Sequence, residues 1–165
     1  MVKLDVGAGP HSEADIQIDR VQFPKTTIVQ DVAMEKWKVS DCSVDEVRME
    51  MIMEHCPSVV EHFNETTKKW ETFYPRVHLM AEAYRVLVPG GILHVSVPGC
   101  FETHSQDPTH CGPQITDGFF NYFCGEWGGG DPADFAYISY GITFKFKKLM
   151  SVNDGFSLTV RLQKE

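Results

Sequence analysis

The stretch of sequence that decides the fold lies near the N-terminus and reads Leu4-Asp5-Val6-Gly7-Ala8-Gly9-Pro10. It describes a short apolar strand that runs directly into a glycine-rich turn. Glycine lets a ligand approach the backbone closely, and open α/β sheets bind nucleotides at the carboxyl ends of their strands. The stretch therefore predicts a nucleotide-type site at the end of the first strand. A tight turn without a ligand stays an alternative interpretation.

A dinucleotide-binding site is disfavoured by the residues that follow this turn. Such a site needs the pattern G-x-G-x-x-G at the start of a helix, because the pyrophosphate binds at the helix N-terminus. Here Pro10, His11 and Ser12 come next, so the third glycine is missing and no helix is predicted.

Three short strands are expected in the first part of the chain, over about 2–6, 15–19 and 27–31. The connections between them are too short for a helix, although a parallel crossover usually contains one. Missing helices would leave one face of the sheet poorly covered. A second copy of the chain would cover that face, so a homo-oligomer is a possible state.

Further elements follow from the spacing of the apolar residues. A fourth strand is expected over 44–50 and a fifth over 92–97. The pattern favours helices over 59–73, over 77–88 with a stop at Pro89-Gly90-Gly91, and over 115–123 with Thr116 as N-cap. Alternating apolar residues predict an antiparallel pair of strands over 138–146 and 156–163, with Asn153-Asp154-Gly155 as the turn before the second.

The segment over about 98–132 differs from the rest of the chain. It is rich in glycine, proline, histidine, cysteine and aromatic residues, and it shows little periodicity. A loop of this length inside a compact domain is usually functional or disordered. We expect it to line the side of the site where a second reactant, the acceptor, would bind, with Gly128-Gly129-Gly130 as its tip.

Composition narrows the classes of function. The 165 residues, with 42% hydrophobic and 23% charged residues, are expected to form a single soluble domain over 1–165. The formal net charge of -8 argues against nucleic acid as a partner, and no apolar run approaches the about 20 residues of a membrane helix. Five cysteines without a C-x-x-C pair favour reduced thiols, so we expect a cytoplasmic protein.

Together these pieces resemble the class I S-adenosylmethionine-dependent methyltransferases. The resemblance rests on the glycine turn, on Asp19 and Asp31 at the ends of the second and third strands, and on Tyr84-Arg85-Val86-Leu87-Val88-Pro89-Gly90-Gly91. It implies an α/β fold with a Rossmann-like, mostly parallel seven-stranded sheet that ends in an antiparallel hairpin. The chain would be a compact variant of the small-molecule branch, with the first two crossover helices reduced or missing.

The resemblance also implies S-adenosylmethionine as cofactor and assigns residues to it. Asp19 would accept the ribose hydroxyls, Asp31 and the backbone N–H of Val32 would contact adenine, and Asp5 would lie beside the methionine amino group. Glu50 and Met51 fall where the sulfonium and methionine part lie. The implied cofactor-binding residues are Asp5, Gly7, Ala8, Gly9, Asp19, Asp31, Val32, Glu50 and Met51.

Two histidines are candidate catalytic residues. His55 ends the stretch after the fourth strand, and His110 belongs to Asp107-Pro108-Thr109-His110 after the fifth; a histidine there can act as general base for a hydroxyl or amine acceptor. A structural role stays an alternative for both. No metal site is expected, because Cys100, His104, His110, Cys111 and Cys124 lack the spacing of zinc modules.

These observations favour methyl transfer from S-adenosylmethionine to the oxygen or nitrogen of a small-molecule acceptor. The alternative is a non-catalytic domain of the same fold that binds the cofactor or serves as a partner subunit. The shortened connections between the first strands motivate this alternative.

Overall fold

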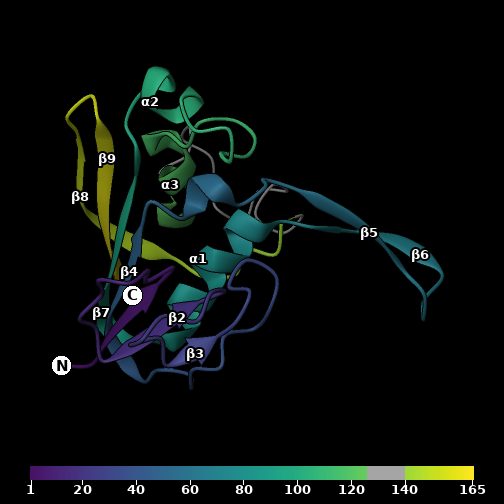
Figure 1. Ribbon diagram of the computed structural model, residues 1–165, viewed down its shortest axis with the longest axis horizontal. Helices are drawn as coiled ribbons and strands as arrows, with labels where there is room; N and C mark the ends of the chain where they lie inside the picture. Colours follow the sequence, from purple (N-terminus) through teal and green to yellow (C-terminus); the bar gives the residue numbers. More distant parts are fainter. Residues whose placement is uncertain (126–139) are drawn as a thin grey trace.

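A seven-stranded sheet carries the fold in the computed structural model, which describes residues 1–125 and 140–165 (Figure 1). The strands of this sheet are β1 (Lys3–Val6), β2 (Ile16–Asp19), β3 (Ile28–Val29), β4 (Val44–Glu50), β7 (Leu87–Pro98), β8 (Phe146–Asn153) and β9 (Ser157–Lys164). The other elements are η1 (Met53–His55), β5 (Val60–Asn64), β6 (Lys69–Phe73), α1 (Pro75–Val86), α2 (Phe101–Ser105) and α3 (Asp117–Cys124).

The order of the strands in the sheet is β3-β2-β1-β4-β7-β9-β8. The pairs from β3 to β7 are parallel, whereas β9 pairs antiparallel with both β7 and β8. The predicted fold class, a mostly parallel sheet that ends in an antiparallel hairpin, is confirmed. The predicted turn at 153–155 is also present, with the Asp154 carboxylate accepting the N–H groups of Phe156 and Ser157.

The first crossovers contain no helix, as the short connections predicted. The consequence is visible in β4, which lies between β1 and β7 yet alternates buried Val47 and Met49 with polar residues. Arg48 of β4 is in register with His94 of β7, which is in register with Arg161 of β9. This face of the sheet is therefore polar, and only the opposite face is apolar.

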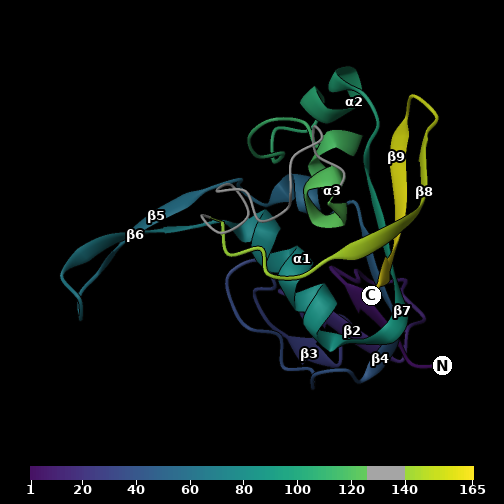
Figure 2. The same ribbon diagram turned by 180° about the vertical axis from the view of Figure 1, so that it is seen from behind.

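The apolar face packs against α1 (Figures 1 and 2). Leu79, Met80, Ala83 and Val86 of α1 are fully buried in the same core as the apolar residues of β1, β4 and β7. Pro75 stands at the first turn of this helix, two residues before the expected start, where its missing N–H costs nothing. The helix ends at Val86 and not beyond, because Leu87 already begins β7.

Arg85 of α1 ties the helix-free segment before β4 to the core. Its guanidinium donates to the carboxylate of Glu82 and to the carbonyls of Trp37 and Val39, at 2.6, 3.0 and 2.8 Å. The Glu82 carboxylate also accepts the N–H of Trp37, at 2.7 Å. The Trp37 side chain is 2% exposed and fills part of the space beside α1.

The predicted helix over 59–73 is wrong, because β5 and β6 form an antiparallel hairpin there. The apolar residues at 59, 60, 63, 70 and 73 have helical spacing, but the polar turn in the middle of the stretch decides the structure. The Asn64 side chain accepts the N–H groups of Thr66 and Thr67, and Lys68 adopts a φ of 55°. The hairpin projects from the body of the protein (Figures 1 and 2).

The predicted strand over 138–146 is also wrong where the structure describes it. Residues 140–145 are not in a strand, and β8 begins at Phe146. The alternation arose because Ile142 and Phe144 pack into the core without pairing with a neighbouring strand. β8 is an edge strand with mostly exposed side chains, so its own pattern gives little signal. Ile138 and the tip at 128–130 lie outside the described residues.

Helical boundaries near the irregular segment are close to those expected. α3 begins after Thr116, although the Thr116 side chain makes no capping hydrogen bond, and the short α2 was not predicted. No helix among the described residues has both the length and the apolarity needed to cross a membrane.

We expect the Arg85→Met substitution to lower the free energy of unfolding by about 2–3 kcal/mol, because the buried Glu82 carboxylate loses its counter-charge and two carbonyl groups lose a donor. Urea denaturation measures this. Arg161→Met, at an exposed position of β9, is the control and should change stability by less than about 0.5 kcal/mol. Equal losses in the two variants would contradict the role of Arg85.

Candidate functional site

Two cavities open at the carboxyl ends of the parallel strands. The glycine-turn cavity, of about 380 Å³, contains five of the residues expected at the cofactor: Gly7, Asp19, Asp31, Val32 and Met51. The histidine cavity, of about 650 Å³, contains Glu54, His55, Asp107 and His110. Met51 and His55 line both of these cavities, so the two are neighbours.

The glycine turn is held by backbone hydrogen bonds to β2. The N–H groups of Gly7 and Ala8 both donate to the carbonyl of Ile18, at 2.8 and 3.2 Å. Gly7 has a φ of 72°, and a Cβ atom at this position would lie 2.3 Å from Cδ1 of Ile52. A side chain at Gly7 would therefore be strained and would push Ile52, which also lines the cavity.

Asp19 closes the same turn from the end of β2. Its two carboxylate oxygens accept the N–H groups of Gly9 and Val21, at 3.0 and 2.9 Å. A carboxylate oxygen has room for a second hydrogen bond, so Asp19 can still accept hydroxyl groups from the cavity. Asp31 follows β3 and orients its carboxylate in a similar way, accepting the N–H of Ala33 at 3.0 Å.

Asp5, Ala8 and Glu50 lie elsewhere, in a polar cavity of about 560 Å³. Arg48 and His11 also line this cavity. Burial raises the pKa of the Asp5 carboxyl, and a hydrogen bond with the side chain of Ser12 acts in the opposite direction. The structure thus divides the predicted cofactor residues between two cavities, on either side of the glycine turn.

The chain makes a sharp turn between β4 and η1, which brings Glu54 and His55 to the site. Met51 adopts a φ of 52°, which is uncommon for a residue with a side chain, and its N–H donates to the carbonyl of Ser96 at 2.9 Å. Strained backbone of this kind persists only where neighbouring contacts hold it, and it is frequent at functional sites. The turn places the Met51 side chain between the two cavities.

Glu54 is buried, with 1% of its surface exposed. Its Oε2 atom has no hydrogen-bond partner among the residues that the structure describes. Burial raises the pKa of this carboxyl, which its own backbone N–H and the charges of His110 and Arg76 partly offset. A buried, unpartnered carboxylate oxygen is costly, so it indicates a group that a ligand or a proton completes.

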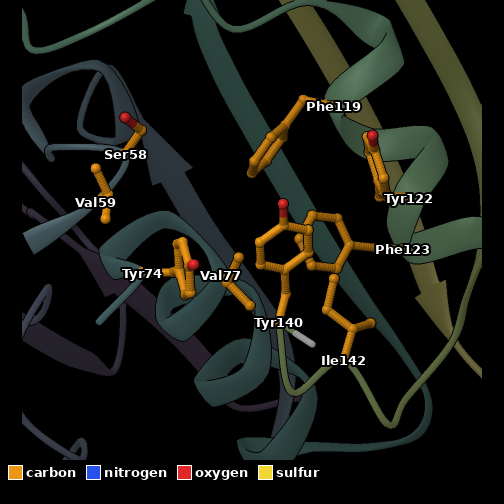
Figure 3. A pocket seen from close by; sticks show the side chains of 9 residues that line it. All are labelled: Ser58, Val59, Tyr74, Val77, Phe119, Tyr122, Phe123, Tyr140 and Ile142. Carbon is orange, nitrogen blue, oxygen red and sulfur yellow. The ribbon is translucent and has the colours of Figure 1, made fainter. Parts of the chain in front are cut away.

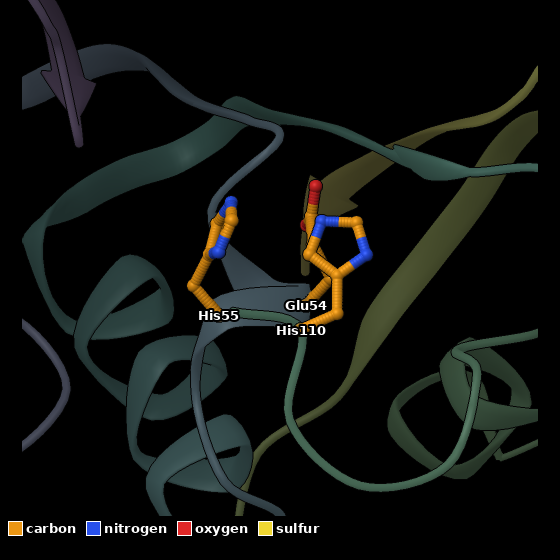
Figure 4. A group of neighbouring side chains, drawn as sticks. All are labelled: Glu54, His55 and His110. Atoms are coloured by element: carbon orange, nitrogen blue, oxygen red, sulfur yellow. The ribbon is translucent and has the colours of Figure 1, made fainter. Parts of the chain in front are cut away.

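His55 and His110, both predicted as catalytic, come together although 54 residues separate them. Their ring centroids are 4.8 Å apart. Nδ1 of His55 lies 2.9 Å from Oγ1 of Thr109, which donates to the Asp107 carboxylate at 2.6 Å. Burial lowers the pKa of His55, and His110 lowers it further. Figure 4 shows the two rings flanking the Glu54 carboxylate.

Arg76, near the start of α1, joins the two chain segments that carry these side chains. It is 4% exposed, and its guanidinium donates to the carbonyls of Cys56, Pro113 and Cys111. The N–H of Cys111 donates in turn to the carbonyl of Glu54, at 2.7 Å. Sequence analysis missed Arg76, because one charged residue in the first turn of a helix carries no signal of burial.

The aromatic residues of α3 line a different cavity, shown in Figure 3. This aromatic cavity has a volume of about 350 Å³ and includes Phe119, Tyr122 and Phe123 together with Tyr74 and Tyr140. From the sequence we expected these aromatic residues to line the acceptor site. The residues that the structure places beside His110 are instead those of the loop before α3.

Comparisons with known proteins bear on the fold. No protein-family model and no curated protein sequence matches the chain. A solved methyltransferase from Archaeoglobus fulgidus, described as S-adenosylmethionine-dependent, has a TM-score of 0.58 at 13% identity over 98% of this chain and 85% of its own. The 1,6-didemethyltoxoflavin-N1-methyltransferase of Burkholderia thailandensis, solved with 1,6-didemethyltoxoflavin and S-adenosylhomocysteine, has a TM-score of 0.57 at 12% identity. That match covers 99% of this chain and 70% of the other.

A third similar structure is the N-methyltransferase NodS of Bradyrhizobium japonicum with bound S-adenosylhomocysteine. Its TM-score is 0.53 at 11% identity, over 99% of this chain and 78% of NodS. At such low identity the likeness concerns the fold. The fold is that of the class I methyltransferases, as the sequence motifs indicated.

We expect the Arg76→Lys substitution to lower the free energy of unfolding by about 2–4 kcal/mol, because an ammonium group cannot reach all three carbonyls that the planar guanidinium binds. Thermal and urea denaturation measure this loss. Arg20→Lys, an exposed arginine at the rim of the glycine-turn cavity, serves as the control. An unchanged midpoint for Arg76→Lys would show that the two segments do not need this anchor.

Proposed function

We propose that the protein transfers a methyl group from S-adenosylmethionine to an oxygen or nitrogen atom of a small molecule. One observation carries the proposal: the glycine-turn cavity and the histidine cavity adjoin, sharing Met51 and His55. Methyl transfer needs two binding sites that meet at the methyl group, because the protein contributes chiefly by positioning the reactants.

The residues of the glycine-turn cavity suit the nucleoside part of the cofactor. Asp19 would accept hydrogen bonds from the ribose hydroxyls, and Asp31 and Val32 would contact adenine. The bare backbone of Gly7 leaves the cavity open where a Cβ atom would displace Ile52. Met51, between the cavities, would lie beside the sulfonium.

The methionine end of the cofactor is zwitterionic and needs groups of both charges. The polar cavity that Asp5, Ala8 and Glu50 line also contains Arg48. We therefore keep Asp5 as the partner of the amino group and Glu50 as a neighbour of the methionine part. Gly9, whose N–H binds Asp19, would connect the two halves of the site.

The histidine cavity would hold the acceptor. S-adenosylmethionine supplies a methyl group on a positively charged sulfur, which leaves as a neutral thioether when the acceptor's lone pair takes the methyl. An acceptor hydroxyl or amine must then lose its proton, and the free ring nitrogen of His110 or His55 can accept it. The lowered pKa of His55 keeps that ring neutral and able to do so near neutral pH.

The alternative is a non-catalytic domain of the same fold. The specific observation behind it is the polar face of β4, with Arg48 and Glu50 exposed, in a sheet whose first crossovers are all loops. A domain of this kind would bind the cofactor without transferring the methyl group, or would bind no cofactor and serve as a subunit. Cofactor binding and methyl transfer are therefore tested separately.

Cofactor binding is tested by calorimetric titration with S-adenosylhomocysteine. We expect Asp19→Ala to weaken binding by about 1.5–3 kcal/mol, because the ribose loses hydrogen bonds to a charged group. Asp15→Ala, an exposed carboxylate that binds only the N–H of Lys3, should bind as the unsubstituted protein does. Absence of binding to the unsubstituted protein would contradict the proposed cofactor.

Methyl transfer is tested by following S-adenosylhomocysteine formation with a panel of phenols, alcohols and amines. His110→Gln should lower turnover on any accepted hydroxyl compound by about 10²–10⁴-fold, the usual contribution of a general base. The matched control is His62→Gln, on the projecting hairpin, which should have full turnover. If His110→Gln lowers only the melting temperature, the histidine is structural.

A further inference from the structure

Three side chains lie close together although cofactor binding does not require their grouping. Glu54, His55 and His110 each offer one ligand atom, and these atoms lie within 4.8 Å of one another (Figure 4). Glu54 and His55 come from η1, and His110 comes from the loop between α2 and α3. We propose that they bind a divalent first-row transition metal ion, with Zn²⁺ as its probe.

The buried carboxylate points to a cation. Glu54 is 1% exposed, and Oε2 lacks a hydrogen-bond partner among the described residues. Arg76 approaches the same region, but the three bonds described for its guanidinium go to backbone carbonyls. A carboxylate buried in this way needs a counter-charge or a ligand, and a metal ion supplies both.

The hydrogen bonds of both histidines are made by Nδ1, and Nε2 of His110 lies 3.7 Å from the Asp107 carboxylate, beyond hydrogen-bond distance. Nδ1 of His110 lies 2.6 Å from the carbonyl oxygen of His104, so Nδ1 must carry the proton. Oγ1 of Thr109 donates its only hydrogen to Asp107, so it accepts one from Nδ1 of His55. Both rings therefore carry their lone pair on Nε2. Metal-bound histidines have this arrangement, in which an outer acceptor holds the second N–H.

The two segments that carry the ligands are also fixed to each other. Cys111, next to His110, donates its N–H to the carbonyl of Glu54, and Arg76 binds the carbonyls of Cys56 and Cys111. Ligands of one Zn²⁺ lie about 3.4 Å apart in a tetrahedral site with bonds of about 2.1 Å. His55 is exposed, so a small tilt of its ring that keeps the hydrogen bond to Thr109 can close the remaining gap.

The donor set selects the class of ion. Two imidazoles and one carboxylate are typical of Zn²⁺ and of other first-row divalent ions, whereas Mg²⁺ and Ca²⁺ prefer oxygen ligands. Three protein ligands leave coordination positions open, and all three line the histidine cavity of about 650 Å³. If the proposed function holds, these positions face the acceptor. Because the ion would occupy the Nε2 lone pairs that we assign to proton acceptance, the histidines would act as general bases only in the metal-free chain.

The test is calorimetric titration of the full chain with Zn²⁺, and separately with Mg²⁺, after treatment with a chelator and buffer exchange. We expect one Zn²⁺ per chain and no measurable binding of Mg²⁺ at the same concentrations. Titration of Co²⁺ followed by visible absorption should give the intense bands of a four- or five-coordinate site.

Variants distinguish Zn²⁺ binding at this site from Zn²⁺ binding to other histidine or cysteine side chains. His110→Gln and Glu54→Gln should weaken Zn²⁺ binding by more than about 100-fold. Thr109→Val, which keeps all three ligands but loses the hydroxyl that joins His55 to Asp107, should weaken it by about 10–100-fold. His62→Gln and Cys111→Ser should bind as the unsubstituted chain does. Thermal denaturation checks the fold of each variant, and His110→Gln decides the matter if Glu54→Gln does not fold.

Two results would overturn the proposal. The first is absence of Zn²⁺ binding to the unsubstituted chain. The second is Zn²⁺ binding that His110→Gln leaves unchanged, including binding that only Cys111→Ser removes. Titration of the metal-free chain with S-adenosylhomocysteine is carried out beside these measurements. Cofactor binding without Zn²⁺ binding would refute the metal site and leave the proposed function standing.

Discussion

The geometry of the candidate site depends on one buried guanidinium. Arg76 donates to carbonyl groups on both sides of the site, those of Cys56, Cys111 and Pro113. Carbonyl groups in loops need hydrogen-bond partners when they are buried, because no neighbouring strand or helical turn supplies them regularly. By meeting this need for two loops at once, Arg76 sets the separation of Glu54 and His55 from His110. A site assembled from loops thereby gains the rigidity that helices and strands usually provide.

A similar solution holds the first part of the sheet. In the absence of crossover helices, the segment between β3 and β4 reaches the core through Trp37, while Arg85 and Glu82 of α1 bind its backbone. The opposite face of β4 is polar, with Glu46 and Arg48 paired at 2.9 Å. The chain thus keeps the strand order of a class I methyltransferase with apolar cover on one face only. Hydrogen bonds from Arg76 and Arg85 compensate for the small number of helices.

Local chemistry explains why much of the fold was predictable. A turn with two glycines at positive φ and a helix with proline in its first turn are each encoded by neighbouring residues. The hairpin of β5 and β6 was mistaken for a helix because its few apolar residues have helical spacing, and only the turn at Asn64 indicates a hairpin. The strand expected at 138–146 failed for a different reason. Its alternating residues pack into the core as irregular chain, and side-chain burial alone does not require a strand.

The sequence by itself determined the first parallel strands, the glycine turn and the acids at the ends of β2 and β3, because each of these depends on residues close together in the chain. It also identified His55 and His110 as separate candidates. Only the tertiary structure brought these two rings to 4.8 Å and buried Glu54 beside them. It also divided the expected cofactor residues between two cavities. Such relations depend on contacts between segments more than 30 residues apart, and no local pattern encodes which carbonyl groups a distant arginine will bind.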